Sequence, residues 1–167
     1  MPRWLIVVLV ILAVFAGYAV IQRANPTVLR ASIEINATPQ QVWAVLTDLD
    51  SYAAWNPFII ESSGDVKVGS TLHNTMHDVT GDRVFTPEVL VADPGRELRW
   101  SGRLWGWGFF DGEHSFVIDE VAPGRVQLTQ SEVFRGILVP VLASSLHKNT
   151  QPQFVAMNEA LAERVAA

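Results

Sequence analysis

The first strong pattern along the chain is an uninterrupted apolar run near its N-terminus. Residues 4–21, WLIVVLVILAVFAGYAVI, contain no charged side chain. Eighteen residues of helix span roughly 27 Å, which is enough to cross the hydrocarbon core of a bilayer. Trp4 and Tyr18 lie near the two ends of the run, where aromatic side chains favour the membrane interface. The pattern predicts a single transmembrane anchor over residues 1–24 and one domain over residues 25–167.

Two other interpretations of this run stay open. In a cleaved signal peptide, Gly17 and Ala19 could serve as the small residues before the cut, although the apolar core of such a peptide usually spans only about 7–15 residues. In a buried core helix, some polar residue would be expected to break the run. Arg3 and the amino terminus balance Arg23 and Arg30, so the positive-inside rule does not decide the side of the membrane on which the domain lies.

After Pro26 the spacing of apolar positions alternates between strand and helix periods. A strand over 28–36 precedes a helix that begins with a Thr38–Gln41 capping box, and a second short helix covers 50–55. Turns rich in Gly and Pro then separate six predicted strands: 58–62, 70–79, 84–93, 96–104, 110–121 and 125–134. Helical spacing returns after a capped start at Thr150, with a separate lead-in turn or helix over 140–147. This order predicts an α+β fold, in which one curved antiparallel sheet wraps around a long C-terminal helix.

Several segments together resemble a known superfamily. They are SIEINATPQQVWAVLTDLDSYAAWNPF, VKVGSTL, VLVADPGRELRW and GEHSFVIDEVAPGRVQLTQSEVFRGIL. The chain resembles the SRPBCC superfamily, in particular its polyketide cyclase and lipid-transport branch. The resemblance implies the helix-grip fold of START and birch-pollen-allergen-type proteins, with a hydrophobic cavity between sheet and helix. Such proteins transport or sense ligands, act on chaperones, or cyclise or hydrate substrates, so the resemblance does not imply one activity.

The segment 103–116, RLWGWGFFDGEHSF, could be a nucleotide loop or an aromatic hairpin. Gly106, Gly108 and Gly112 are spaced somewhat like a dinucleotide fingerprint, but that motif needs a helix after it and here a strand follows. The sequence therefore predicts a hairpin, with Trp105 and Trp107 at its tip. These two side chains could line the mouth of a cavity or rest on a membrane.

Side-chain alternation places three polar residues on the inner face of the sheet. His114, Gln130 and Glu132 share that face with Phe116 and other apolar residues. Two registers of this hairpin are possible. If the numbers of residues paired across it sum to 244, His114 lies opposite Gln130; if they sum to 246, it lies opposite Glu132. The group could be a satisfied polar pair that fixes the register, a polar anchor for a ligand, or the general acid and base of a cyclase or hydratase.

The predicted function is that of a membrane-anchored domain binding a lipid or another hydrophobic small molecule. The alternatives are an enzyme that uses His114 and Glu132, and a protein-interaction module of the chaperone-activator kind. The predicted binding residues are Trp55, Phe58, Trp100, Trp105, Trp107, Phe110, His114, Phe116, Gln130, Glu132, Phe134 and Phe154.

Charge and cysteine content narrow the possible partners. From residue 25 onward the chain has ten basic and seventeen acidic residues, which argues against nucleic-acid binding. The absence of cysteine excludes disulfides and thiolate chemistry. His73 and His77 are about 13 Å apart along a predicted strand, which is too far for two ligands of one ion. We therefore expect neither a metal nor a cofactor.

Overall fold

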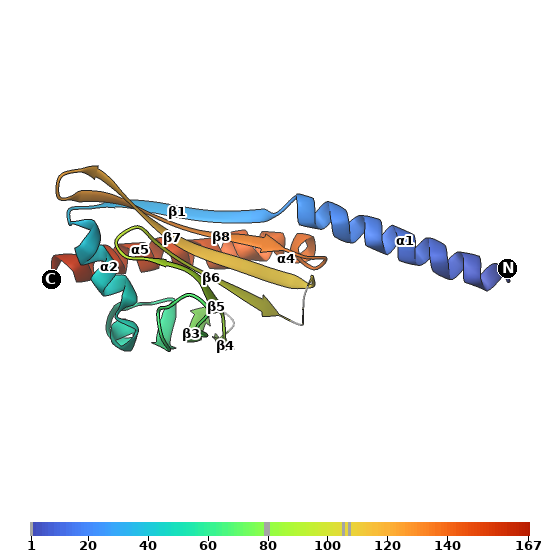
Figure 1. Cartoon of the computed structure of the whole chain (residues 1–167), viewed down its shortest axis with the longest axis horizontal. Helices are drawn as coiled ribbons and strands as arrows, with labels where there is room; N and C mark the ends of the chain where they lie inside the picture. The colour runs from blue at the N-terminus through green and yellow to red at the C-terminus, as the bar shows by residue number, and fades with distance from the viewer. Residues whose placement is uncertain (1, 79–80, 105, 107) are drawn as a thin grey trace.

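The structure is a computed structural model that describes every residue except 1, 79–80, 105 and 107. A long N-terminal helix, α1 (Arg3–Ala24), projects away from a folded domain that holds all the other elements (Figure 1). Among the described residues one helix, Arg3–Gln22, is long and apolar enough to cross a membrane, and none of that window is buried within the domain.

The domain is α+β, as predicted, and its strands are antiparallel. The larger sheet has the order β1-β8-β7-β6-β5, and a smaller sheet has the order β2-β3-β4. The larger sheet consists of β1 (Thr27–Ile35), β5 (Glu88–Asp93), β6 (Glu97–Leu104), β7 (Phe110–Ala122) and β8 (Arg125–Arg135). The smaller sheet consists of β2 (Ile59–Ser63), β3 (His73–Asp78) and β4 (Gly81–Phe85).

The expectation of one continuous sheet, with a single strand over 84–93, is wrong. The strand is interrupted at Pro87, because proline has no N–H to donate to a β-ladder. Before it, β4 pairs with β3; after it, β5 pairs with β6. Backbone bonds still connect the segment before β3 to the start of β5, because the N–H of Leu72 donates to the carbonyl of Pro87 at 2.8 Å and the N–H of Val89 donates to the carbonyl of Ser70 at 2.9 Å.

Two short helices close one end of the domain. In α2 (Pro39–Thr47) the predicted capping box is present, since Thr38 accepts from the N–H of Gln41 and the Gln41 side chain accepts from the N–H of Thr38. A 3₁₀ turn (Leu49–Ser51) leads into α3 (Tyr52–Trp55). The Asn56 side chain then accepts the N–H groups of residues 58 and 59, which ends the helix and starts β2.

The C-terminal helices run along one face of the larger sheet (Figure 1). Three helical segments follow one another without a break: α4 (Val139–Ser145), a π-helical turn (Leu146–Thr150) and α5 (Gln151–Ala166). The predicted capped start at Thr150 is therefore wrong, because Thr150 has helical backbone angles and makes no side-chain cap. A single long helix with an internal π turn replaces the expected lead-in and separate helix.

The core lies between α5, α2 and the larger sheet. Phe154, Met157 and Leu161 of α5 are fully buried, and they pack against Leu29, Leu128 and other inward residues of the strands. The space beneath α5 is thus filled by side chains. The space beneath α4 and the π turn is open, and it forms the pocket described next.

Candidate functional site

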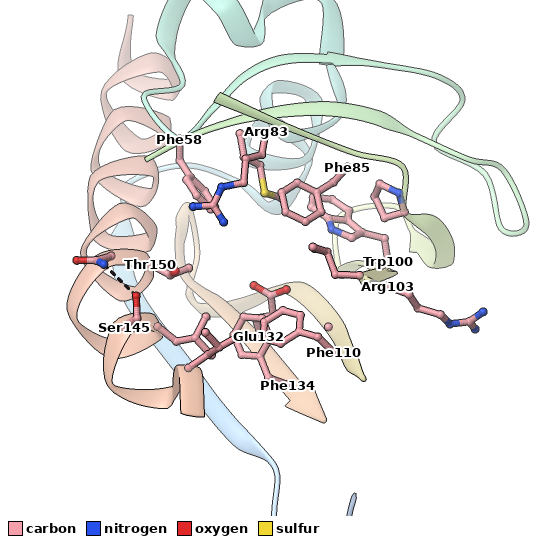
Figure 2. A pocket seen from close by; sticks show the side chains of 18 residues that line it. Phe58, Arg83, Phe85, Trp100, Arg103, Phe110, Glu132, Phe134, Ser145 and Thr150 are labelled. Carbon is pink, nitrogen blue, oxygen red and sulfur yellow. Dashed lines mark hydrogen bonds between the residues drawn. The ribbon is translucent and has the colours of Figure 1, made fainter. Parts of the chain in front are cut away.

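A pocket of about 180 Å³ lies between the larger sheet, β3 and β4, and the helical segment 142–150 (Figure 2). An engineered apolar cavity of roughly 150 Å³ is large enough to bind benzene, so this pocket has room for at least one ring. Most of its wall is apolar and comes from Phe58, Met76, Phe85, Pro87, Trp100, Leu104, Phe110, Phe134, Leu142 and Leu146. The few polar groups in the wall are therefore the ones able to orient a ligand.

The helical wall of the pocket contains the π turn. Leu142 and Ser145 of α4, with Leu146, Asn149 and Thr150 of the turn, line this side. Asn149 Nδ2 donates to Ser145 Oγ at 3.1 Å, which holds the two polar side chains together. π turns interrupt the regular helix register and occur frequently at functional sites. Here the turn coincides with the part of the helix that faces the pocket.

The sheet wall of the pocket carries one carboxylate, that of Glu132 on β8 (Figure 2). Only 16% of this side chain is exposed. It lies over Gly112 of β7, where an added Cβ would be 2.6 Å from Glu132 Oε1. Because Gly112 has no side chain, there is room above it for the Glu132 carboxylate. In the described part of the chain no donor hydrogen-bonds Oε1, so this oxygen is available to a ligand.

Behind the carboxylate, His114 connects Glu132 to Gln130. The β7–β8 register pairs His114 with Glu132, which is the 246 alternative of the two predicted. Gln130 Nε2 is 3.0 Å from His114 Nε2, and His114 Nδ1 is 3.4 Å from Glu132 Oε2. With the Gln130 amide nitrogen as the donor, His114 Nε2 accepts, and Nδ1 carries the proton that lies between the ring and Glu132. The ring therefore donates to Glu132, and neither of its nitrogens is free for a ligand.

Aromatic rings fix the orientation of His114. The imidazole stacks on Trp100 with centroids 5.1 Å apart and planes 12° apart. Phe154 also packs against the imidazole in a T-shaped arrangement, with centroids 4.9 Å apart and planes 70° apart. Only 1% of His114 is exposed. A ring held this tightly positions the Glu132 carboxylate, in the way that supporting residues hold a binding group.

The ten predicted binding residues that the structure describes fall into three groups. Phe58, Trp100, Phe110, Glu132 and Phe134 line the pocket. His114, Phe116, Gln130 and Phe154 are buried in the core next to it. Trp55 lies on α3, where its indole donates to Ser51 Oγ at 3.2 Å and packs on Tyr52, away from the pocket lining. Trp105 and Trp107 lie outside the described residues.

Sequence reasoning missed two parts of the lining. Arg83 and Phe85 line the pocket from β4, but treating 84–93 as one strand obscured that segment. Leu142 and Leu146 are four residues apart, a spacing that indicates one helix face and could have been used. Arg103 also borders the pocket although it is exposed.

The histidines of β3 that were considered as metal ligands, His73 and His77, do not belong to a metal-binding cluster among the described residues. His77 Nδ1 bonds Asp82 Oδ1 at 2.6 Å across β3 and β4. Among the described residues, no group of three His, Cys, Asp or Glu side chains is arranged to hold a metal ion. A second hollow of about 390 Å³, bordered by Asp48, Asp50 and Asp65, is mostly polar and is separate from the pocket.

Comparison with solved structures identifies the same fold in proteins of low sequence identity. The Zhui aromatase/cyclase of a Streptomyces species has a TM-score of 0.69 and 16% identity, covering 85% of this chain and 94% of that one. A START superfamily protein from Mycobacterium smegmatis has a TM-score of 0.62 and 19% identity, covering 83% and 97%. Norcoclaurine synthase from Thalictrum flavum has a TM-score of 0.66 and 13% identity, covering 84% and 94%.

A search of curated protein sequences finds no match to the chain. The family described as polyketide cyclase / dehydrase and lipid transport matches residues 26–166, which is nearly the whole domain after α1. The chain therefore belongs to this family, within the SRPBCC superfamily that its sequence resembles.

Proposed function

We propose that this protein is a membrane-anchored binding protein for a hydrophobic small molecule, which it holds in the pocket beneath α4. The observation that carries the proposal is the pocket itself, a mostly apolar chamber of about 180 Å³ whose lining includes the carboxylate of Glu132 and the side chains of Arg83 and Arg103. The anchor supports the proposal physically, because a bilayer concentrates apolar molecules and tethering keeps the domain close to them.

The ligand's chemistry follows from the wall of the pocket. Aromatic and aliphatic side chains favour a ring or short hydrocarbon segment. Glu132 Oε1 favours a hydroxyl or amine that can donate a hydrogen bond. On the opposite side, Ser145, Asn149 and Thr150 offer polar atoms that could pair with a second group. The proposed ligand is therefore a ring-bearing amphiphile with at least one donor.

Catalysis is a second candidate, and two observations favour it. Glu132 is a positioned carboxylate within an apolar pocket, and two of the structures with this fold are named as a cyclase and a synthase. In such a reaction Glu132 would contact the substrate as a general base, and His114 would act as a positioning residue behind it. The expected acid–base pair, with both residues reaching substrate, does not fit a ring whose two nitrogens are engaged.

The interaction-module alternative requires a filled space beneath the helix. Side chains fill the space beneath α5, but the pocket beneath α4 leaves room for a ligand. An empty cavity is costly, at roughly 24 cal/mol per Å³ in core-truncation series, which favours an occupant.

The test compares the molecules that co-purify with the full chain and with a variant whose pocket is filled. Gly102 of β6 lines the pocket, and an added Cβ there meets nothing closer than Pro87 at 3.7 Å. Gly102→Phe therefore places a ring in the pocket. Val121→Phe, at the exposed β7–β8 end, is the matched control. Each chain is extracted into polymer-bounded membrane discs, and organic extracts are compared by mass spectrometry.

Bulk membrane lipids will be common to all samples. The proposal expects a molecule that is stoichiometric in the wild type and in Val121→Phe but depleted in Gly102→Phe. Identical extracts from all three chains would contradict it. Conversion of the identified molecule to a product by wild type, but not by Glu132→Gln, would favour the catalytic candidate.

A further inference from the structure

Two uncharged segments meet at the end of the domain from which α1 emerges. Residues 104–110, LWGWGFF, and residues 136–146, GILVPVLASSL, contain no charged side chain. The first connects β6 to β7, and the second connects β8 to α4 and forms that helix. Hydrogen bonds join them, since the N–H of Ile137 donates to the carbonyl of Gly108 at 3.0 Å and that of Leu138 to the carbonyl of Phe109 at 3.1 Å.

The same place contacts the anchor helix. Tyr18 of α1 donates its hydroxyl to the carbonyl of Ile137 at 3.3 Å, across 119 positions of sequence. Tyr18 is three residues before the last residue of the apolar run, or about 5 Å along the helix axis. If the apolar run spans the bilayer, this tyrosine lies at the interface, where its ring and hydroxyl are favoured. Ile137 and its bonded neighbours are then held at the same depth.

Exposed apolar side chains lie beside this contact. Val141, in the first turn of α4, is 79% exposed, and Phe109 is 45% exposed. A valine and a phenylalanine facing water are unremarkable singly, but these two belong to the two uncharged segments beside the anchor. Their burial in the headgroup region would remove apolar area from water at the point where α1 already fixes the domain.

We infer that the surface formed by Phe109, Ile137, Leu138, Pro140 and Val141 rests on the lipid bilayer that α1 spans. This inference rests on the proposed membrane anchoring and deepens it by naming the bilayer itself as the partner of this surface. Leu104, Phe110 and Leu142, from the same two segments, form part of the pocket wall. The wall of the pocket nearest to α1 therefore borders the membrane, and its ligands are molecules that partition into the bilayer interface.

A single fluorescent label tests the contact with lipid. The chain has no cysteine, so Val141→Cys gives one labelling site for an environment-sensitive NBD fluorophore. Val121→Cys is the control, because it is also an exposed valine but lies beyond Glu120, near the β7–β8 turn. That turn is at the opposite end of β8 from Phe134, which pairs with the first residue of β1. The full chains are reconstituted into phosphatidylcholine vesicles with or without nitroxide-labelled phosphatidylcholine.

The expected result is blue-shifted emission and strong nitroxide quenching at position 141, with neither at position 121. If the chain resists alkaline extraction but position 141 behaves like position 121, the docking surface is wrong and the anchor stands. A blue shift at 141 without nitroxide quenching would mean that protein covers the surface, which also overturns the inference. Release of the chain by alkaline extraction would overturn both the inference and the proposed anchoring.

Discussion

Gly112 and Gly102 face each other across β7 and β6, and an alanine at each is expected to have opposite effects. Both glycines line the pocket, and neither has a positive φ, so alanine is compatible with the backbone at both positions. At Gly112 the new Cβ would be 2.6 Å from Glu132 Oε1, whereas at Gly102 it would make an ordinary contact with Pro87. Gly112→Ala must therefore displace the carboxylate, and Gly102→Ala leaves it in place.

The expected change in the free energy of unfolding follows from the loss of the His114–Glu132 hydrogen bond in Gly112→Ala. Ordinary nonbonded contact requires the carboxylate to move by roughly 1 Å, and the His114–Glu132 bond is already 3.4 Å long, so it breaks. A hydrogen bond to a charged group contributes about 1.5–3 kcal/mol, and this long one belongs at the lower end. Alanine at a compatible glycine site contributes about 0.4–1 kcal/mol in the other direction. The net expectation is a loss of about 1 kcal/mol for Gly112→Ala and a gain of about 0.5 kcal/mol for Gly102→Ala.

Two measurements check this prediction. Thermal unfolding, followed by tryptophan fluorescence, should show Gly112→Ala lower in Tm by about 2–4 °C and Gly102→Ala slightly higher than wild type. The nitrogen chemical shifts of the His114 ring should change in Gly112→Ala alone, because only there does Nδ1 lose its acceptor. The chain has four histidines, which keeps this spectrum simple.

Equal stability and identical His114 ring shifts in the two alanine variants would contradict this prediction. That outcome would mean that the carboxylate does not occupy the space over Gly112, or that His114 does not hold it. The function proposed for Glu132 would then lose its structural basis, although the apolar pocket would remain.

Three further predictions concern the frame around the pocket. Burial, with a smaller contribution from Asp48, raises the pKa of Tyr52, so above pH 10 the unfolded chain loses a proton that the folded chain keeps. Stability should therefore fall with rising pH there by about 1.4 kcal/mol per unit, and pH-dependent urea unfolding of Tyr52→Phe should lack that slope. Gly136→Ala should cost about 3 kcal/mol or more, by the same unfolding assay, because its φ is +134° and the Cβ would strike the Phe109 carbonyl. Thr38→Ala should remove the α2 cap and cost about 1 kcal/mol in urea unfolding, whereas a cost near zero would mean that the cap does not stabilise the helix.

Local patterns in the sequence predicted much of this fold. Alternation of side chains reduced the partner of His114 to Gln130 or Glu132, because a strand exposes every second residue on the same face. The structure has the register that pairs it with Glu132. The Thr38–Gln41 capping box predicted the start of α2 for an equally local reason, since its partners are three residues apart. Strand alternation and the capping box can both be recognised from the spacing of residues along one short segment of sequence.

Features that depend on tertiary contacts were not predictable in the same way. Pro87 stood inside a run of strand-like residues, and only the pairing of β4 and β5 with different partners shows that it divides two sheets. The π turn at 146–150 has no simple sequence signature, so its place in the wall of the pocket was not predictable, although the spacing of Leu142 and Leu146 does indicate one helix face. The division of aromatic residues between pocket and core also depends on the path of α4 and α5, which places Phe116 and Phe154 in the filled part.

Binding of a small molecule in the pocket beneath α4 is tested most directly by finding where on the chain that molecule is bound. Photo-leucine, incorporated throughout the full chain in cells, crosslinks to molecules in contact with leucine side chains when it is irradiated. We expect peptide mass spectrometry to show a common small-molecule adduct on the pocket residues Leu104, Leu142 and Leu146, but not on the buried core residue Leu128. Unmodified pocket leucines, in a chain whose α1 leucines carry lipid adducts, would contradict the claim that the pocket holds a ligand.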